Sequence, residues 1–289
     1  MRGLAAFREE VAAFRREVRA LRTALAGPRT SLLEALRRRG ILLGRAGAPE
    51  GLLFPSTLSQ TRQSRLYEHL KRYSFRLFLR DLIAHQDALR PEALTRFCSA
   101  ETAARYFRFL RSCGIIRRGR GGTLRLHQEG VFSFGATLEW LVAQVLTREF
   151  GAPALWGCRL LDLGEGGDYD VLSLVEGSLL YVEVKSSPPK HIEEAEVAAF
   201  LDRLSELMPN VAIFLVDTEL RMKDKLVGLF EAALARREGR GRGRPARPPA
   251  VTRLLNETFV LEGSVFLTNT RPSLVQALGT CLRAHFGRR

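Results

Sequence analysis

The chain has 289 residues, of which 46% are apolar, and its formal net charge is +14. A chain of this length and apolar content can bury an ordinary core, which argues against a disordered tail. It holds no run of about 18 uninterrupted apolar residues, and Arg and Glu recur at its N-terminus, so we expect no membrane span, no signal peptide and a cytoplasmic location. The four cysteines contain no C-x-x-C pair, which favours buried free thiols over a zinc site or a disulfide framework.

The charge is unevenly distributed along the chain. Residues 1–130 hold 26 Lys/Arg against 11 Asp/Glu, residues 131–236 hold 9 against 17, and residues 237–289 hold 10 against 3. A basic flank beside a region that concentrates carboxylates is typical of a metal-dependent enzyme that acts on nucleic acid. Because 40 of the 45 basic residues are Arg, a coding bias toward Arg is the alternative explanation.

Residues 1–53 are predicted to form an all-helical N-terminal segment. Apolar residues spaced alternately three and four apart predict a helix with a narrow apolar seam, formed by Leu4, Phe7, Val11, Phe14, Val18, Leu21 and Leu25. This helix either pairs with its copy in a homodimer or lies on another part of the same chain. A short helix over residues 32–40 and a Gly/Pro-containing connector follow.

Residues 54–130 are predicted to form a small helical domain that ends in a basic hairpin. Helical patterns cover residues 74–85, 90–98 and 99–116, with Ser99 as the N-cap of the third, and residues 117–126 read as two short strands. Three helices and a hairpin resemble the winged helix-turn-helix. That resemblance implies DNA contacts from the third helix and the wing, through Arg105, Arg108, Arg111, Arg117, Arg118 and Arg120. Alternatively, these arginines form a solvated face and the domain packs on a neighbour.

Residues 131–289 are predicted to form an α/β domain. A helix over 132–151, three extended runs within 154–187, a helix over 192–207, a strand over 210–218 and a helix over 221–237 give the order αβββαβα. The basic, helix-breaking stretch 238–249 is predicted to be a flexible loop. Strand and helix patterns over 257–286 are expected to complete the same sheet.

The candidate chemistry lies on two strands that a Glu-Gly turn joins. Residues two apart on a strand share a face, so Glu183 and Lys185 point the same way. A tight turn brings Asp168 and Asp170 across the hairpin, with Asp170 opposite either Lys185 or Glu183, and the sequence does not decide the register. Carboxylates beside a lysine suit a hard divalent cation such as Mg²⁺ at a phosphate substrate.

These residues resemble the PD-(D/E)xK nuclease superfamily, which includes many restriction enzymes and Holliday junction resolvases. Asp170 matches the motif aspartate, the tripeptide from Glu183 to Lys185 matches (D/E)xK, and Glu139 matches the upstream acid of resolvase-like members. The resemblance implies a restriction endonuclease-like αβββαβ core with a mixed sheet and a Mg²⁺- or Mn²⁺-dependent DNA endonuclease. It also implies that Asp170, Glu183 and the Val184 carbonyl bind the metal, that Lys185 serves the nucleophilic water, and that Glu139 assists.

The chain departs from the family pattern at two places. Tyr169 precedes Asp170, where the pattern that gives the family its name has proline. The glutamine that some members carry on the helix after the lysine has no obvious counterpart, and the residues nearest to that place are Lys190, His191 and Glu194.

Several alternatives remain open at this level. Asp168 competes with Asp170 for the metal, and His127 and His191 are further acid or base candidates. A lone E-x-K tripeptide also fits a surface ion pair. The alternative function is a non-catalytic DNA-binding protein, either a winged-helix regulator or an inactive nuclease fold, and a third is a nuclease that an unknown partner activates.

Overall fold

The computed structural model describes residues 31–47, 49–86, 89–119, 123–161, 163, 168–240, 251–261 and 263–287. The predicted heptad helix, the wing residue Arg120 and residues 241–249 of the predicted flexible loop lie outside these ranges. Within the described ranges, no helix has the length and apolarity that a membrane span requires.

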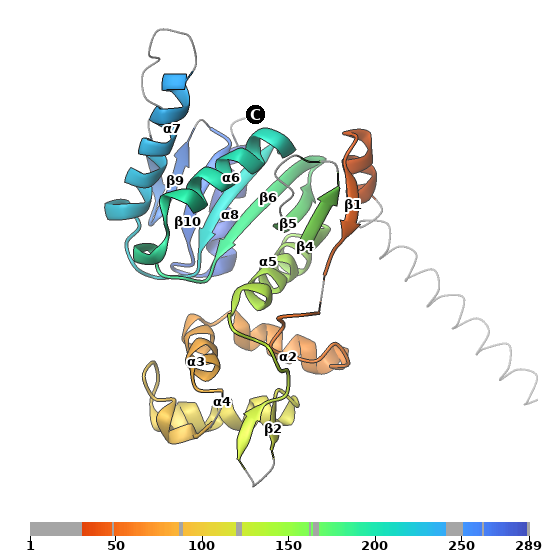
Figure 1. The fold of residues 1–289 in the computed structure, drawn as a ribbon, viewed down its shortest axis with the longest axis vertical. Coiled ribbons are helices and arrows are strands. Elements are labelled where there is room, and N and C mark those ends of the chain that lie inside the picture. The colour runs from red at the N-terminus through yellow and green to blue at the C-terminus, as the bar shows by residue number, and fades with distance from the viewer. Residues whose placement is uncertain are drawn as a thin grey trace, which may run out of the picture.

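One mixed sheet of eight strands forms the centre of the molecule (Figure 1). The pairs β6/β7 and β7/β10 are parallel, and the other neighbouring pairs are antiparallel. The spatial order is β1 (Leu42–Arg45), β4 (Ala154–Leu161), β5 (Asp168–Val175), β6 (Ser178–Lys185), β7 (Val211–Val216), β10 (Val265–Asn269), β9 (Thr258–Leu261) and β8 (Thr252–Leu255). The mixed α/β fold predicted from the sequence is therefore confirmed.

Helices cover both faces of this sheet. One face packs against α5 (Gly135–Glu149) and α8 (Leu274–Phe286), and the other packs against α6 (Glu194–Leu207) and α7 (Gly228–Arg240). A short π-helical turn, Lys223–Val227, precedes α7, and a helix over residues 31–38 packs on the same face as α6 and α7. Strand β7 is buried along its whole length, as expected of a parallel strand covered on both sides.

The chain order from α5 to β7 is αβββαβ, as the sequence predicted. Strands β9 and β10 and helix α8 then complete the same sheet, which was also expected. The segment that was predicted as a helix and a connector contributes one more strand: β1 pairs with β4 at the edge of the sheet. Strand β1 was not predicted from the sequence, because four residues around Gly44 show no strand periodicity of their own.

Below the sheet in Figure 1 lies a helical module, which we define as residues 60–126. It contains α2 (Gln60–Leu70), α3 (Tyr73–Ala84), α4 (Ala100–Ser112) and a hairpin of β2 (Ile116–Arg118) and β3 (Leu124–Leu126). The Ser99 hydroxyl accepts a hydrogen bond from the Thr102 backbone N–H at the start of α4, as predicted for an N-cap.

The prediction of a helix over residues 90–98 was wrong. Only a single 3₁₀ turn, Pro91–Ala93, forms there, and the first of the three helices in the module is α2. Leu94 is the only fully buried side chain within residues 92–98. A nine-residue segment with so small an apolar anchor cannot offset the cost of helix nucleation.

A buried ion pair joins the helical module to the sheet. Arg76 of α3 is 0% exposed and donates from Nε and Nη2 to the Asp217 carboxylate, at 2.9 and 2.8 Å. Arg80 and the Thr270 hydroxyl donate to the same carboxylate. Burial would raise the pKa of Asp217, but Arg76 and Arg80 outweigh it and hold the pKa below its usual value. The Asp217 backbone N–H donates to the Lys185 carbonyl at 2.8 Å, so the module is fixed beside the end of β6.

Candidate active site

Strands β5 and β6 separate at the position of the candidate residues. The hairpin turns at Glu176 and Gly177, both at positive φ, and pairs Val175 with Ser178 through to Val171 with Val182. That register carried one residue further places Asp170 beside Glu183. The next backbone amide, that of Val184, donates to Asp170 Oδ2 at 2.7 Å. The sequence left open whether Asp170 lies opposite Lys185 or opposite Glu183, and the observed register places it beside Glu183.

Glu183 and Lys185 share the face of β6 that α6 covers. Glu183 is 2% exposed, and its carboxylate accepts hydrogen bonds from the Tyr181 hydroxyl, from Lys185 Nζ at 3.0 Å and from Arg203 Nη1 at 3.1 Å. Lys185 Nζ also lies 3.0 Å from Glu196 Oε1. Burial lowers the pKa of Lys185, but the two carboxylates outweigh this and raise its pKa above the usual value, so the side chain is an ammonium.

Glu139 reaches the same cluster from α5. Burial, then the charges of Glu183 and Asp168, raise the pKa of Glu139 to about 7, while a hydrogen bond from the Gly157 backbone opposes the rise. Gly157 lies on β4 at φ +54, and a Cβ at that position would lie 3.7 Å from Glu139 Oε2. The glycine therefore lets its backbone amide face the Glu139 carboxylate in a conformation that other residues rarely adopt.

Asp170, and not Asp168, belongs to the partly buried cluster. Burial, then the charges of Glu183 and Glu139, raise the pKa of Asp170 well above its usual value. The Asp168 side chain is 53% exposed and lies 3.5 Å from Arg45. The structure thus brings Glu139, Asp170, Glu183 and Lys185 together from three elements.

The oxygen donors of the cluster bear on whether it could hold a metal ion. Within the described ranges, no group of three or more His, Cys, Asp or Glu side chains is arranged to hold a metal ion. Mg²⁺ needs fewer protein ligands, since it binds through one or two carboxylates and keeps several waters. The donors near Asp170 are hard oxygens. Burial, and after it the charges of neighbouring carboxylates, raise the pKa values of Glu139 and Asp170, and a bound cation would offset that neighbouring negative charge. This donor set fits a hard divalent cation.

Three contributors to the cluster were not predicted from the sequence. Arg203 and Glu196 reach β6 from α6, and Tyr181 hydrogen-bonds the carboxylate two residues along its own strand. Strand alternation places Tyr181 on the face of Glu183, but it does not show that the hydroxyl contacts the carboxylate. Arg203 and Glu196 depend on how α6 packs on the sheet, which periodicity does not reveal.

The helix after Lys185 supplies an acid near the position where some nucleases carry glutamine. Glu196 contacts Lys185 Nζ and also accepts a hydrogen bond from the Glu193 backbone N–H at 3.0 Å, which closes a capping box at the start of α6. Glu194, one of the residues named for this place, pairs instead with Arg236 of α7. His127 and His191 are exposed, and within the described ranges neither side chain forms a hydrogen bond or an ion pair with the cluster.

The arginines predicted to contact DNA are on the surface of the helical module. All five that the structure describes are exposed: Arg105, Arg108 and Arg111 on α4, and Arg117 and Arg118 on β2. Arg117 pairs with Glu129 at 2.7 Å, which leaves it less free to meet phosphate than its neighbours on α4.

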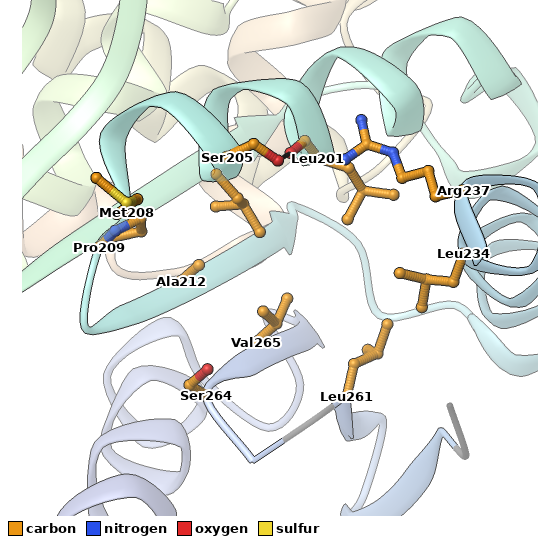
Figure 2. A pocket seen from close by; sticks show the side chains of 11 residues that line it. Leu201, Ser205, Met208, Pro209, Ala212, Leu234, Arg237, Leu261, Ser264 and Val265 are labelled. Carbon is orange, nitrogen blue, oxygen red and sulfur yellow. Dashed lines mark hydrogen bonds between the residues drawn. The ribbon is translucent and has the colours of Figure 1, made fainter. Parts of the chain in front are cut away.

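A cavity of about 260 Å³ lies elsewhere, between α6, α7 and the start of β10. Figure 2 shows Leu201, Leu234, Leu261 and Val265 around it, with Arg237 at one side. Arg237 pairs with Asp202 at its edge. None of the candidate residues lines this cavity, so it is not the site of the predicted chemistry.

Comparisons with known proteins give weak likenesses. No family model and no curated protein sequence matches the chain. Protein VC1899 from Vibrio cholerae aligns at 16% identity with a TM-score of 0.42 over 70% of this chain and 55% of its own. Can2 from Sulfobacillus thermosulfidooxidans, solved with cyclic tetra-adenylate, aligns at 12% identity with a TM-score of 0.39 over 65% and 50%. The chain spans about half the length of these structures, and likeness at this level assigns neither a fold nor an activity to it.

Proposed function

We propose that the chain is a PD-(D/E)xK-type nuclease that hydrolyses DNA phosphodiester bonds with Mg²⁺ or Mn²⁺, acting as an endonuclease. The observation that carries the proposal is the partly buried cluster of Glu139, Asp170 and Glu183 beside the Lys185 ammonium. Carboxylates gathered in this way are costly to desolvate unless they serve a purpose, and such clusters concentrate at functional sites.

Asp170, Glu183 and the Val184 carbonyl would hold the metal ion. When bound, it would polarise the phosphodiester and lower the pKa of a water molecule. The protein's own contribution is the framework. The hydrogen bond from the Val184 amide orients the Asp170 carboxylate, and Arg203 orients that of Glu183.

Lys185 acts as a cation and not as a base in this proposal. Its pairing with Glu183 and Glu196 keeps the proton on Nζ, so the side chain can donate hydrogen bonds and offset negative charge that develops on the phosphate. Arg does not replace it freely, because the guanidinium is larger and planar. The exposed arginines of α4 would contact the DNA backbone.

Cleavage of a mixed DNA panel by matched lysine variants tests the proposal. Linear, circular, single-stranded and four-way-junction DNA are incubated with Mg²⁺, Mn²⁺ or EDTA and with wild-type, Lys185→Met or Lys190→Met protein. We expect metal-dependent cleavage that falls about 100-fold or more in Lys185→Met, because one electrostatic donor is lost. Lys190 is exposed five residues away, so its variant should keep wild-type activity. Equal cleavage by all three proteins would indicate a contaminant.

One observation favours a second function, a DNA-binding protein without catalysis. The Glu183 carboxylate already accepts hydrogen bonds from Tyr181, Lys185 and Arg203, which together satisfy it without a metal ion. DNA binding without cleavage of any substrate, in either metal and after addition of cell lysate, would select this function. Cleavage that appears only with the lysate would select a nuclease activated by a partner.

A further inference from the structure

Helix α2 has two polar faces, and within the described residues the charged side chains of only one of them form ion pairs. On the first, the Tyr67 hydroxyl donates to Glu149 of α5 at 2.6 Å and Lys71 Nζ lies 3.1 Å from the same carboxylate. Arg148 of α5 lies over the Tyr67 ring, with its guanidinium carbon 4.6 Å from the ring centroid. This face fixes α2 to the α/β part of the molecule.

The second face of α2 is a basic stripe that lies beside α4. Arg62, Arg65 and His69 are spaced three and four apart, which places them in one row along the helix, and Arg72 follows in the two-residue turn between α2 and α3. The three arginines are exposed. The His69 ring stacks on Phe109 of α4, with centroids 4.0 Å apart, and the Arg65 guanidinium lies 5.8 Å from the same ring centroid.

The arginines of α4 continue this stripe. Burial, then the charges of Arg72, Arg65 and Arg105, lower the pKa of His69, so arginines from both helices converge on it. We define the α2–α4 basic face as Arg62 and Arg65 of α2, Arg72 of the turn that follows α2, and Arg105, Arg108 and Arg111 of α4.

The charge of the α2–α4 basic face is not neutralised by the part of the chain that the structure describes. The acids on the two helices are Glu68 and Glu101. Glu68 pairs with Lys71 at 2.9 Å, and no ion pair within the described ranges involves any of the six arginines. Like charges gathered without counter-charge repel one another, so an anionic partner would be bound with a gain in free energy.

We propose that the α2–α4 basic face binds the phosphodiester backbone of a nucleic acid, with Arg62, Arg65 and Arg72 as its second row of contacts. The nature of the partner rests on the proposed function. From Arg62 to its end at Leu70 the helix rises about 12 Å, long enough to face more than one phosphate. Guanidinium forks match phosphate oxygens, and the rings beneath them, Tyr106 and Phe109, are buried, unlike the exposed apolar residues of a membrane-binding helix.

A rigid connection runs from this face to the candidate active site. Arg76 donates from Nη1 to the backbone carbonyls of Leu70 and Lys71, at the end of α2, at 2.8 and 3.1 Å. Its other nitrogens hold Asp217, whose amide donates to the Lys185 carbonyl. A backbone bound along α2 is therefore held in a fixed position relative to β6, which suits a substrate contact more than an independent anion site.

Binding of fluorescent DNA and RNA duplexes of one sequence, measured by anisotropy in EDTA, tests the proposal without cleavage. The variant Arg62→Ser/Arg65→Ser/Arg72→Ser removes the second row. Its matched control, Arg37→Ser/Arg38→Ser/Arg221→Ser, removes the same charge from exposed sites outside the module. We expect the α2 variant to raise Kd about tenfold or more and to reduce the slope of log K against log salt by about two to three, and the control to change Kd less than about threefold. A triple Arg→Lys variant at the α2 positions should retain most of the affinity.

Each outcome separates this proposal from the function on which it rests. Equal affinity of the α2 variant and its control overturns the role of α2, even if Arg105→Ser/Arg108→Ser/Arg111→Ser weakens binding. A selective loss of DNA and RNA binding in the α2 variant supports the role of α2 even if no substrate is ever cleaved. Absence of cleavage would contradict only the proposed nuclease activity. Comparable affinities for the DNA and RNA duplexes would show that the phosphodiester backbone is recognised. A higher affinity for one of them would show which nucleic acid is the partner. Binding to phosphatidylserine vesicles without binding to either duplex would overturn it.

Discussion

The backbone amide of Gly157 hydrogen-bonds the Glu139 carboxylate from a conformation that residues with a Cβ rarely adopt. This glycine lies in the left-handed region at φ +54 in the middle of β4, where its amide meets the Glu139 carboxylate. An added Cβ meets only an ordinary contact at 3.7 Å, so the cost of a substitution comes from the backbone conformation.

Gly157→Ala is therefore expected to lower the free energy of unfolding by about 1–2 kcal/mol. Gly228 is the matched control, because it has an ordinary helical φ of −61 and open space around its Cα. Gly228→Ala should be neutral or stabilising by up to about 1 kcal/mol. Urea denaturation of both variants measures this, and equal effects would contradict the strain that we assign to Gly157.

At this scale, strand alternation was enough to place Glu183 and Lys185 on one face. The choice between Asp168 and Asp170 followed from the match to the family motif, and the exposure of Asp168 agrees with it. Arg203 was not predictable, because it lies on another element and reaches Glu183 only through the packing of α6 on the sheet.

At the scale of elements, the ion pair between Arg76 and Asp217 fixes the helical module against the sheet. Both side chains are at most 1% exposed, and the pair joins α3 to the end of β7. Buried ion pairs often add little net stability, because desolvation offsets their attraction, but removing one partner leaves an uncompensated charge.

Arg76→Met should thus destabilise the protein by about 3–5 kcal/mol, and Arg76→Met/Asp217→Leu by less than the sum of the single changes. The exposed pair of Arg236 and Glu194 is the control, with an expected effect of Arg236→Met within about 1 kcal/mol. Chemical denaturation of the full cycle provides the coupling energy. Additive single effects would show that the pair does not join the module to the sheet.

The order of elements from α5 to β7 was predictable because each has a strong period of its own. The helix predicted over residues 90–98 does not form, since the apparent helical pattern there lacks the buried stripe that stabilises a helix in a fold. Strand β1 could not be predicted because it is defined by its partner: four residues become a strand through hydrogen bonds to β4, more than a hundred positions along the chain.

Across the whole molecule, the two kinds of charge occupy different parts. The acidic middle region of the sequence supplies Glu139, Asp170 and Glu183 to one partly buried cluster, and the basic front region supplies the exposed arginines of α2 and α4. The uneven charge of the sequence predicted this division but not its geometry. The position of the basic face relative to β6 depends on Arg76, whose role is visible only in the folded chain.

The central claim is that Asp170 and its neighbours bind a divalent cation for catalysis. Calorimetric titration of Mn²⁺ into wild-type, Asp170→Asn and Asp168→Asn protein tests it most directly, since the two changes are chemically identical and two residues apart. We predict saturable binding to the wild type, a Kd raised about tenfold or more by Asp170→Asn, and a change below about threefold for Asp168→Asn. Equal binding by all three proteins, or no binding by the wild type, would contradict the account.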